Sequence, residues 1–165
     1  MLQFKMIYST SLYIVGGFNR PKSHTRCSQD VCVANFVEES TYETKHISAD
    51  CDYAHSGEEA GASALITDIL GSGSTPVIQV SSADDAQEGD VVLSVERSTR
   101  APYVAISHVW SDGLGNPRNN TLPRCQLRRL QGYVNSLYPK SSRPVSFWID
   151  TICVPRQTHL RRKAI

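Results

Sequence analysis

The feature that most constrains the fold is a strand–helix–strand pattern in the last third of the chain. Tyr103 to Ser107 and Val145 to Asp150 are short apolar stretches of the kind that form buried strands. Between them, apolar residues recur at spacings of three and four and define one helix face: Leu127, Leu130, Val134 and Leu137. Thr121 is expected to cap this helix and Pro139 to end it. The order predicts a βαβ unit with two parallel strands and a right-handed crossover.

Polar and aromatic residues follow both predicted strands. His108, Trp110 and Asp112 follow the first strand, whereas Asp150 and Cys153 belong to the end of the second and the loop after it. Ligands of open parallel sheets bind at the carboxyl ends of strands, so we expect these five residues to converge on one pocket. His108, Asp150 and Cys153 contain the parts of a cysteine-nucleophile site. The alternative is structural, with Cys153 and the tryptophans packing the edge of the core.

Residues 1–100 are predicted to form a small Cys/His-rich α+β segment ahead of this unit. Residues 57–70 have a helical pattern, with one expected buried face: Ala62, Leu65, Ile66 and Ile69. Gly71 suits the left-handed position that ends a helix. Two strands are expected after it, Pro76 to Val80 and Val91 to Glu96.

The same segment is rich in potential metal ligands between residues 24 and 55. Zinc is typically held by four Cys and His side chains, and we expect one structural zinc on a Cys3His set: Cys27, Cys32, His46 and Cys51. All four ligand positions are then filled by protein, which is typical of a structural site. The competing interpretation is a set of ordinary thiols and surface histidines.

Charge is distributed unevenly along the chain. Residues 38–96 contain 13 acidic residues and one basic residue, whereas residues 97–165 contain 12 basic and two acidic residues. The basic residues are scattered and no aromatic-interleaved basic run occurs, so no nucleic-acid partner is expected. No apolar run reaches the roughly 18–20 residues that span a bilayer, so no membrane association is expected either. Five cysteines without a disulfide-module pattern favour a reducing, cytoplasmic location.

The motifs in the last third resemble the heterokaryon-incompatibility (HET) domain of fungi. The stretch from Tyr103 to Trp110 is similar to the opening motif of that family, and the stretch from Phe147 to Pro155 is similar to its second motif. Ser111 to Pro117 and Leu122 to Leu127 resemble an extension and a helix start found in one subgroup. Leu160 to Ile165 resembles the start of the next helix, so residues 101–165 correspond to the first part of a HET domain truncated at its C-terminal end.

The resemblance implies a fold and a role. HET domains are regarded as relatives of Toll/interleukin-1 receptor domains, which implies an α/β protein with a partial doubly wound parallel sheet. It also implies an intracellular signalling or interaction module of fungal non-self recognition and regulated cell death, with protein partners and self-association. Some Toll-like domains cleave NAD with a glutamate, but residues 97–165 contain no glutamate. Enzymatic activity of this chain is therefore not the favoured hypothesis.

Two alternative functions remain. The first is an enzyme that acts on a nucleotide at the strand-end pocket, with the basic half of the chain attracting the anion. The second is a zinc-stabilised binding module, in which the HET-like part is a remnant.

Overall fold

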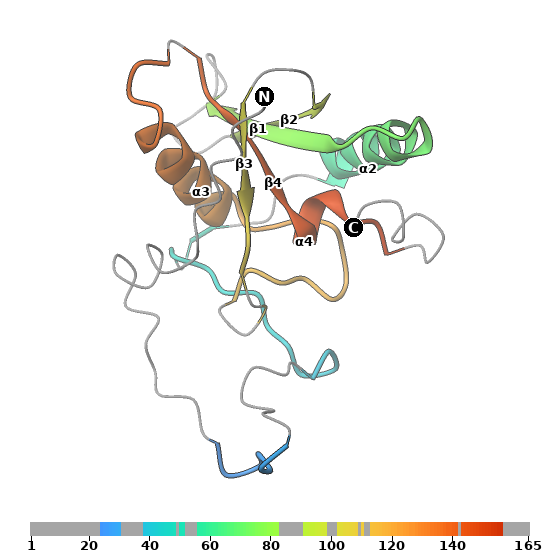
Figure 1. Ribbon diagram of the computed structural model, residues 1–165, viewed down its shortest axis with the longest axis vertical. Helices are drawn as coiled ribbons and strands as arrows, with labels where there is room; N and C mark the ends of the chain where they lie inside the picture. The colour runs from blue at the N-terminus through green and yellow to red at the C-terminus, as the bar shows by residue number, and fades with distance from the viewer. Residues whose placement is uncertain are drawn as a thin grey trace.

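A computed structural model describes residues 24–30, 38–48, 50–51, 56–82, 91–98, 102–108, 110, 113–141 and 143–156. At residues 56–60 and 82 it describes the backbone alone. Asp112 and Cys32 lie outside them. Within these ranges the protein is mixed α/β, with one four-stranded sheet in the order β2-β1-β4-β3 and three helices (Figure 1). No helix there combines the length and apolar character needed to cross a bilayer.

The predicted strand–helix–strand unit is confirmed. Strand β3 (Tyr103–Ile106) and strand β4 (Ser146–Ile149) pair in parallel, and helix α3 (Arg124–Ser136) lies between them in the chain. The helix begins after Pro123, so the expected cap at Thr121 was wrong. Leu127, Leu130 and Val134 are buried as predicted. Leu137 is 41% exposed because the helix ends one residue before it.

The sheet is mixed, which corrects the expectation of a parallel sheet. Strand β1 (Pro76–Ser82) is antiparallel to both β2 (Val91–Arg97) and β4. Only residues 83–90 connect β1 to β2, and parallel neighbours need a crossover of about a dozen residues or more. The short connection therefore requires an antiparallel pair. Because β1 also pairs with β4, one sheet contains strands from both sides of residue 100.

Helix α2 (Ser56–Gly71) confirms the helix predicted at 57–70. Its C-terminal end has two bonds typical of a Schellman motif, from Gly73 N–H to the Leu70 carbonyl (3.0 Å) and from Ser74 N–H to the Ile69 carbonyl (3.1 Å). The left-handed residue is Gly73, with φ of 75°, and not Gly71 as predicted. Leu65 is 51% exposed, because the buried face is centred nearer Ile66 and Leu70.

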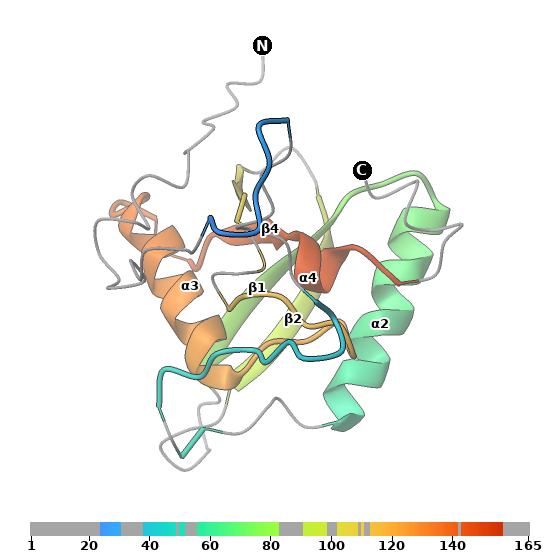
Figure 2. The same ribbon diagram turned by 90° about the horizontal axis from the view of Figure 1, so that it is seen from below.

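One hydrophobic core unites these elements. It takes side chains from all four strands, from α2 and α3, and from the one-turn helix α4 (Asp150–Cys153). A buried glutamine fastens α3 to the sheet: the side-chain carbonyl of Gln131 accepts the Val80 N–H (2.8 Å), and its amide donates to the Val145 carbonyl (2.9 Å). Figure 2 shows α2 and α3 on opposite sides of the view with the strands between them. The core thus holds the ends of β3 and β4 at a fixed separation.

Candidate functional site

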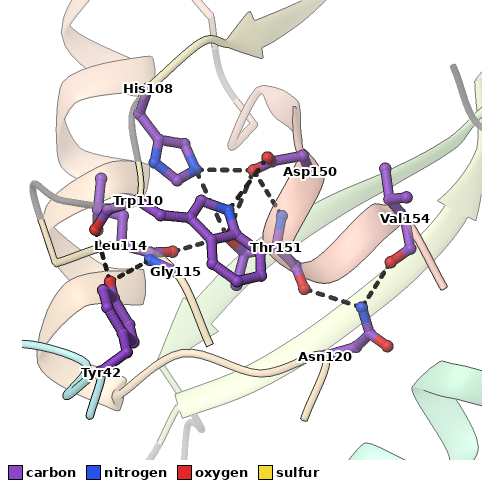
Figure 3. A network of polar contacts seen from close by, with 9 residues as sticks. All are labelled: Tyr42, His108, Trp110, Leu114, Gly115, Asn120, Asp150, Thr151 and Val154. Carbon is purple, nitrogen blue, oxygen red and sulfur yellow. Dashed lines mark hydrogen bonds and ion pairs between the residues drawn. The ribbon is translucent and has the colours of Figure 1, made fainter. Parts of the chain in front are cut away.

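The candidate site forms where β3 and β4 end. Ile106 and Ile149 are register partners at the carboxyl ends of these parallel strands. The chain continues from β3 to His108 and Trp110, and from β4 directly into α4, which begins with Asp150. Parallel pairing therefore brings together residues that are about forty positions apart in the sequence. Figure 3 shows His108 and Trp110 pointing toward Asp150.

The Asp150 carboxylate is the hub of this network. Its Oδ1 accepts hydrogen bonds from His108 Nε2 and from the Thr151 backbone N–H, each at 2.7 Å. Its Oδ2 accepts a longer bond of 3.3 Å from the indole Nε1 of Trp110. One carboxylate thus ties both strand-end loops together.

The surroundings of Asp150 favour its charged form. Burial raises the pKa of the carboxyl, but the hydrogen bond and positive charge of His108 outweigh it, helped by the N–H groups of Thr151 and Trp110. The net result is a pKa below the ordinary value of 3.8. The His108 side chain is only 2% exposed, whereas that of Asp150 is 39% exposed. The histidine is therefore an internal partner, and only the carboxylate reaches solvent.

The second nitrogen of His108 has an unusual position. Its Nδ1 is buried and has no hydrogen-bond partner among the described residues. Buried polar atoms are nearly always paired, and residues 109, 111 and 112, which follow His108 in the chain, lie outside the described ranges.

Thr151 and Asn120 close the network on the side of the loop before α3. Thr151 Oγ1 donates to the Leu114 carbonyl at 2.6 Å. The amide of Asn120 donates to the carbonyls of Thr151 (2.9 Å) and Val154 (2.7 Å). Both side chains bond backbone carbonyls of the loop before α3 or of the turn at α4, so their role is to hold these segments together.

Cys153 does not join the pair formed by His108 and Asp150. It is fully buried in the hydrophobic core. Burial, with the nearby charge of Asp150, raises the pKa of its thiol to about 12. A thiol with this pKa is almost entirely protonated at neutral pH, and the thiolate is the nucleophile. Of the two interpretations of Cys153, the structure therefore supports the structural one, in which it is a small core residue, over a cysteine nucleophile.

A shallow cavity of about 120 Å³ lies beside the network. Of the five predicted pocket residues, Trp110 and Asp150 line it, together with Trp148, Asn120 and Thr151. At its rim Arg156 and Glu39 form an exposed ion pair, with Arg156 Nη2 and Glu39 Oε2 3.5 Å apart. Typical small-molecule pockets measure about 300–1,000 Å³. The cavity beside the network is therefore much smaller than a dinucleotide needs.

Segment 38–48 covers the strand-end loop, which the sequence patterns did not indicate. Tyr42 Oη donates to the Trp110 carbonyl (2.7 Å) and accepts the Gly115 N–H (2.8 Å). Thr44 Oγ1 donates to the Gly115 carbonyl, and Lys45 N–H donates to that of Gly113. These residues have no periodicity or motif that would have predicted this role.

The predicted metal-ligand set is rearranged. The ligand atoms of His46, Cys51 and Cys125 all lie within 4.8 Å of one another, so this group could hold a metal ion. Cys27 does not belong to the group and instead contacts His24, with its Sγ 3.5 Å from Nδ1. Cys125 was missed because it lies 74 residues beyond Cys51, inside a motif interpreted as a helix start.

The thiol of Cys125 is in an activating environment. Burial raises its pKa, but hydrogen bonds from the backbone of Ile47, Ser48 and Gln126 and from the side chain of Cys51 outweigh this effect. The net pKa lies below the ordinary value of 9.0. Cys125 is also the second residue of α3, where the helix dipole favours a negative charge.

Comparison with protein-family models, with curated proteins and with solved structures found no match for this chain. Its function must therefore be inferred from the residues and their geometry.

Proposed function

We propose that this chain is a cytoplasmic signalling module of the HET type, which acts in fungal non-self recognition and regulated cell death by binding protein partners, including copies of itself. The proposal takes the mixed α/β core as part of a Toll-like, doubly wound fold. Neither nucleic acid nor a membrane is the expected partner. The single observation that carries the proposal is the structural use of the motif residues at the strand ends.

The residues that resemble the two HET motifs are engaged in holding the fold. The polar groups of Trp110, Asp150 and Thr151 form hydrogen bonds with one another and with the Leu114 carbonyl. In a catalytic site we would expect reactive groups to face a cavity large enough for substrate. The network supports a module in which the fixed shape of the strand-end loops, and not a reacting group, is the property that matters.

The outer position of β3 in the sheet supports self-association. Within the described residues β3 is an outer strand and pairs only with β4. Unpaired backbone groups on an edge strand readily pair with a second chain. Ala105, in the middle of β3, is exposed and carries no charge that would discourage such pairing.

The nucleotide-acting alternative has one favourable observation, the short contact between His108 and Asp150. This pair has the form of a general base with its orienting carboxylate. However, the histidine is 2% exposed and the adjoining cavity is about 120 Å³, so a substrate has no access to the imidazole through the described residues. These two facts favour the interaction module.

Matched charge substitutions on the two outer strands test the proposal. Ala105→Lys places a charge on β3, and Val92→Lys places the same charge on an exposed position of β2. Sedimentation at increasing concentration should show self-association of the natural chain and of Val92→Lys, but not of Ala105→Lys. A natural chain that stays monomeric at all concentrations refutes the self-association proposal.

Induced expression in a filamentous fungus tests the cellular role. The natural chain and Val92→Lys should reduce viability, as measured with a vital dye, whereas Ala105→Lys should not. Equal viability for all three at equal protein level would refute the role in cell death.

A further inference from the structure

We infer that His46, Cys51 and Cys125 bind one zinc ion, which fastens the segment ending at Cys51 to the first turn of α3. The site differs from the predicted Cys3His clip, whose ligands all come from residues 27–51. It joins the N-terminal segment to the βαβ unit across 74 residues of sequence. The inference does not depend on the proposed signalling role.

The three ligand atoms are close to the arrangement that zinc requires. They lie within 4.8 Å of one another. With Zn–S bonds near 2.3 Å and Zn–N bonds near 2.1 Å, the edges of a tetrahedral site measure about 3.5–3.8 Å. Closing the group around an ion therefore needs side-chain shifts of about 1 Å or less, which rotations about χ1 supply.

Backbone donors are already directed at both sulfur atoms. Ile47 N–H donates to Cys125 Sγ at 3.2 Å, and Cys125 N–H donates to Cys51 Sγ at 3.1 Å. Such hydrogen bonds stabilise negative charge on a metal-bound thiolate and fix its orientation. Gln126, the next residue of α3, donates from its side-chain amide to the Lys45 carbonyl at 3.0 Å. This bond holds the backbone beside His46 in place, so the site is preorganised.

The ligand types select the metal. Two thiolates and one imidazole form a soft to borderline donor set, which suits zinc far better than calcium or magnesium. Two thiolates also balance the double charge of Zn²⁺. His46 is exposed and both cysteines are partly exposed, so an ion can reach them from solvent. The described residues supply three of the four ligands that zinc usually takes.

The ion would stiffen the cover over the strand-end network. The segment held by His46 and Cys51 is the continuation of the stretch in which Tyr42 and Thr44 bind the loop that carries Gly115. The segment has no helix or strand within residues 38–48, so it is held in place by hydrogen bonds to other parts of the chain. A metal anchor at its end therefore limits how far the cover can open.

The test uses the full chain, purified with excess Zn²⁺ under reducing conditions and then freed of unbound metal. Two matched pairs of variants separate the two ligand sets: Cys125→Ser against Cys27→Ser, and His46→Ala against His24→Ala. Both histidines are exposed, so neither histidine substitution threatens folding. Metal content is measured by mass spectrometry, and thiol alkylation is mapped to individual cysteines with and without a chelator.

The expected result is about one zinc per natural chain, retained in Cys27→Ser and His24→Ala. Cys125→Ser and His46→Ala should bind zinc at least about 100-fold more weakly, because loss of a ligand costs more than loss of a supporting hydrogen bond. Zinc should protect Cys51 and Cys125 from alkylation and leave Cys27 unprotected. Zinc bound equally by His46→Ala and the natural chain, zinc lost in Cys27→Ser but not in Cys125→Ser, or no zinc at all would each overturn the inference.

Discussion

Replacing Thr151 with valine tests whether the strand-end network stabilises the fold. Thr151 is 3% exposed, and its hydroxyl donates a 2.6 Å hydrogen bond to the Leu114 carbonyl. Valine has nearly the same shape but no donor, so the substitution removes this bond from a buried carbonyl without opening a cavity. The backbone bond from Thr151 N–H to Asp150 Oδ1 is retained.

The magnitude follows from the burial of the groups involved. Leaving a buried acceptor without its donor costs about 1–3 kcal/mol. For a chain of this length, 1 kcal/mol lowers the melting temperature by about 2–4 °C. Thr151→Val should therefore unfold about 2–12 °C below the natural protein.

The assay is urea unfolding followed by the fluorescence of the two tryptophans, with thermal unfolding as a second measurement. The control is Thr67→Val, because the Thr67 hydroxyl also donates to a carbonyl, that of Ser63 at 2.9 Å, but on an exposed helix surface. This control should change the free energy of unfolding by less than about 0.5 kcal/mol. If Thr151→Val matches the control, the network does not stabilise the fold and the reasoning fails.

Three further predictions address charge, packing and catalysis. Because the pKa of Asp150 is lower in the folded than in the unfolded protein, its charge stabilises the fold above about pH 3.9, and this contribution is lost as pH falls through the folded pKa. When urea unfolding is repeated at decreasing pH below about 4, Asp150→Asn should therefore lose less stability than the natural protein. Gly115→Ala should destabilise the fold by about 1–3 kcal/mol, because its new Cβ would lie 2.5 Å from the Trp110 ring. Gly132→Ala in α3 meets no atom and should stabilise the fold by up to about 1 kcal/mol, so equal unfolding midpoints in urea for the two variants would contradict this packing argument. Incubation of the natural chain with NAD should release no more nicotinamide than a buffer blank, as measured by chromatography. If the natural chain releases nicotinamide and Asp150→Asn does not, the nucleotide-acting alternative is established instead.

Much of the fold was predictable because local patterns specify it. Helices α2 and α3 and strands β1 to β4 were each expected close to where they occur, since their apolar spacing and their bounding Gly and Pro residues are local signals. Where the bounds of these elements were wrong, the errors lie at their ends. Leu137 continued the apolar spacing, yet the helix stops at Ser136, and spacing alone does not show where the last turn closes.

The candidate site was predictable only in part. Asp150 and His108 were expected to meet because the ends of parallel strands share one edge, and they do. Cys153 carried the same motif signal, but the single turn of α4 directs it into the core. Local spacing does not reveal the direction in which such a turn points its side chains.

The sequence by itself determined the elements, the parallel pairing of β3 with β4 and the meeting of His108 with Asp150, because each depends on residues near one another in the chain or on the geometry of a βαβ unit. Only the tertiary structure decided that β1 joins this sheet antiparallel to β4, and that Cys125 lies beside His46 and Cys51. Both outcomes depend on how separate elements bury their apolar faces in one core. That packing energy is a property of the whole chain and leaves no local pattern to read.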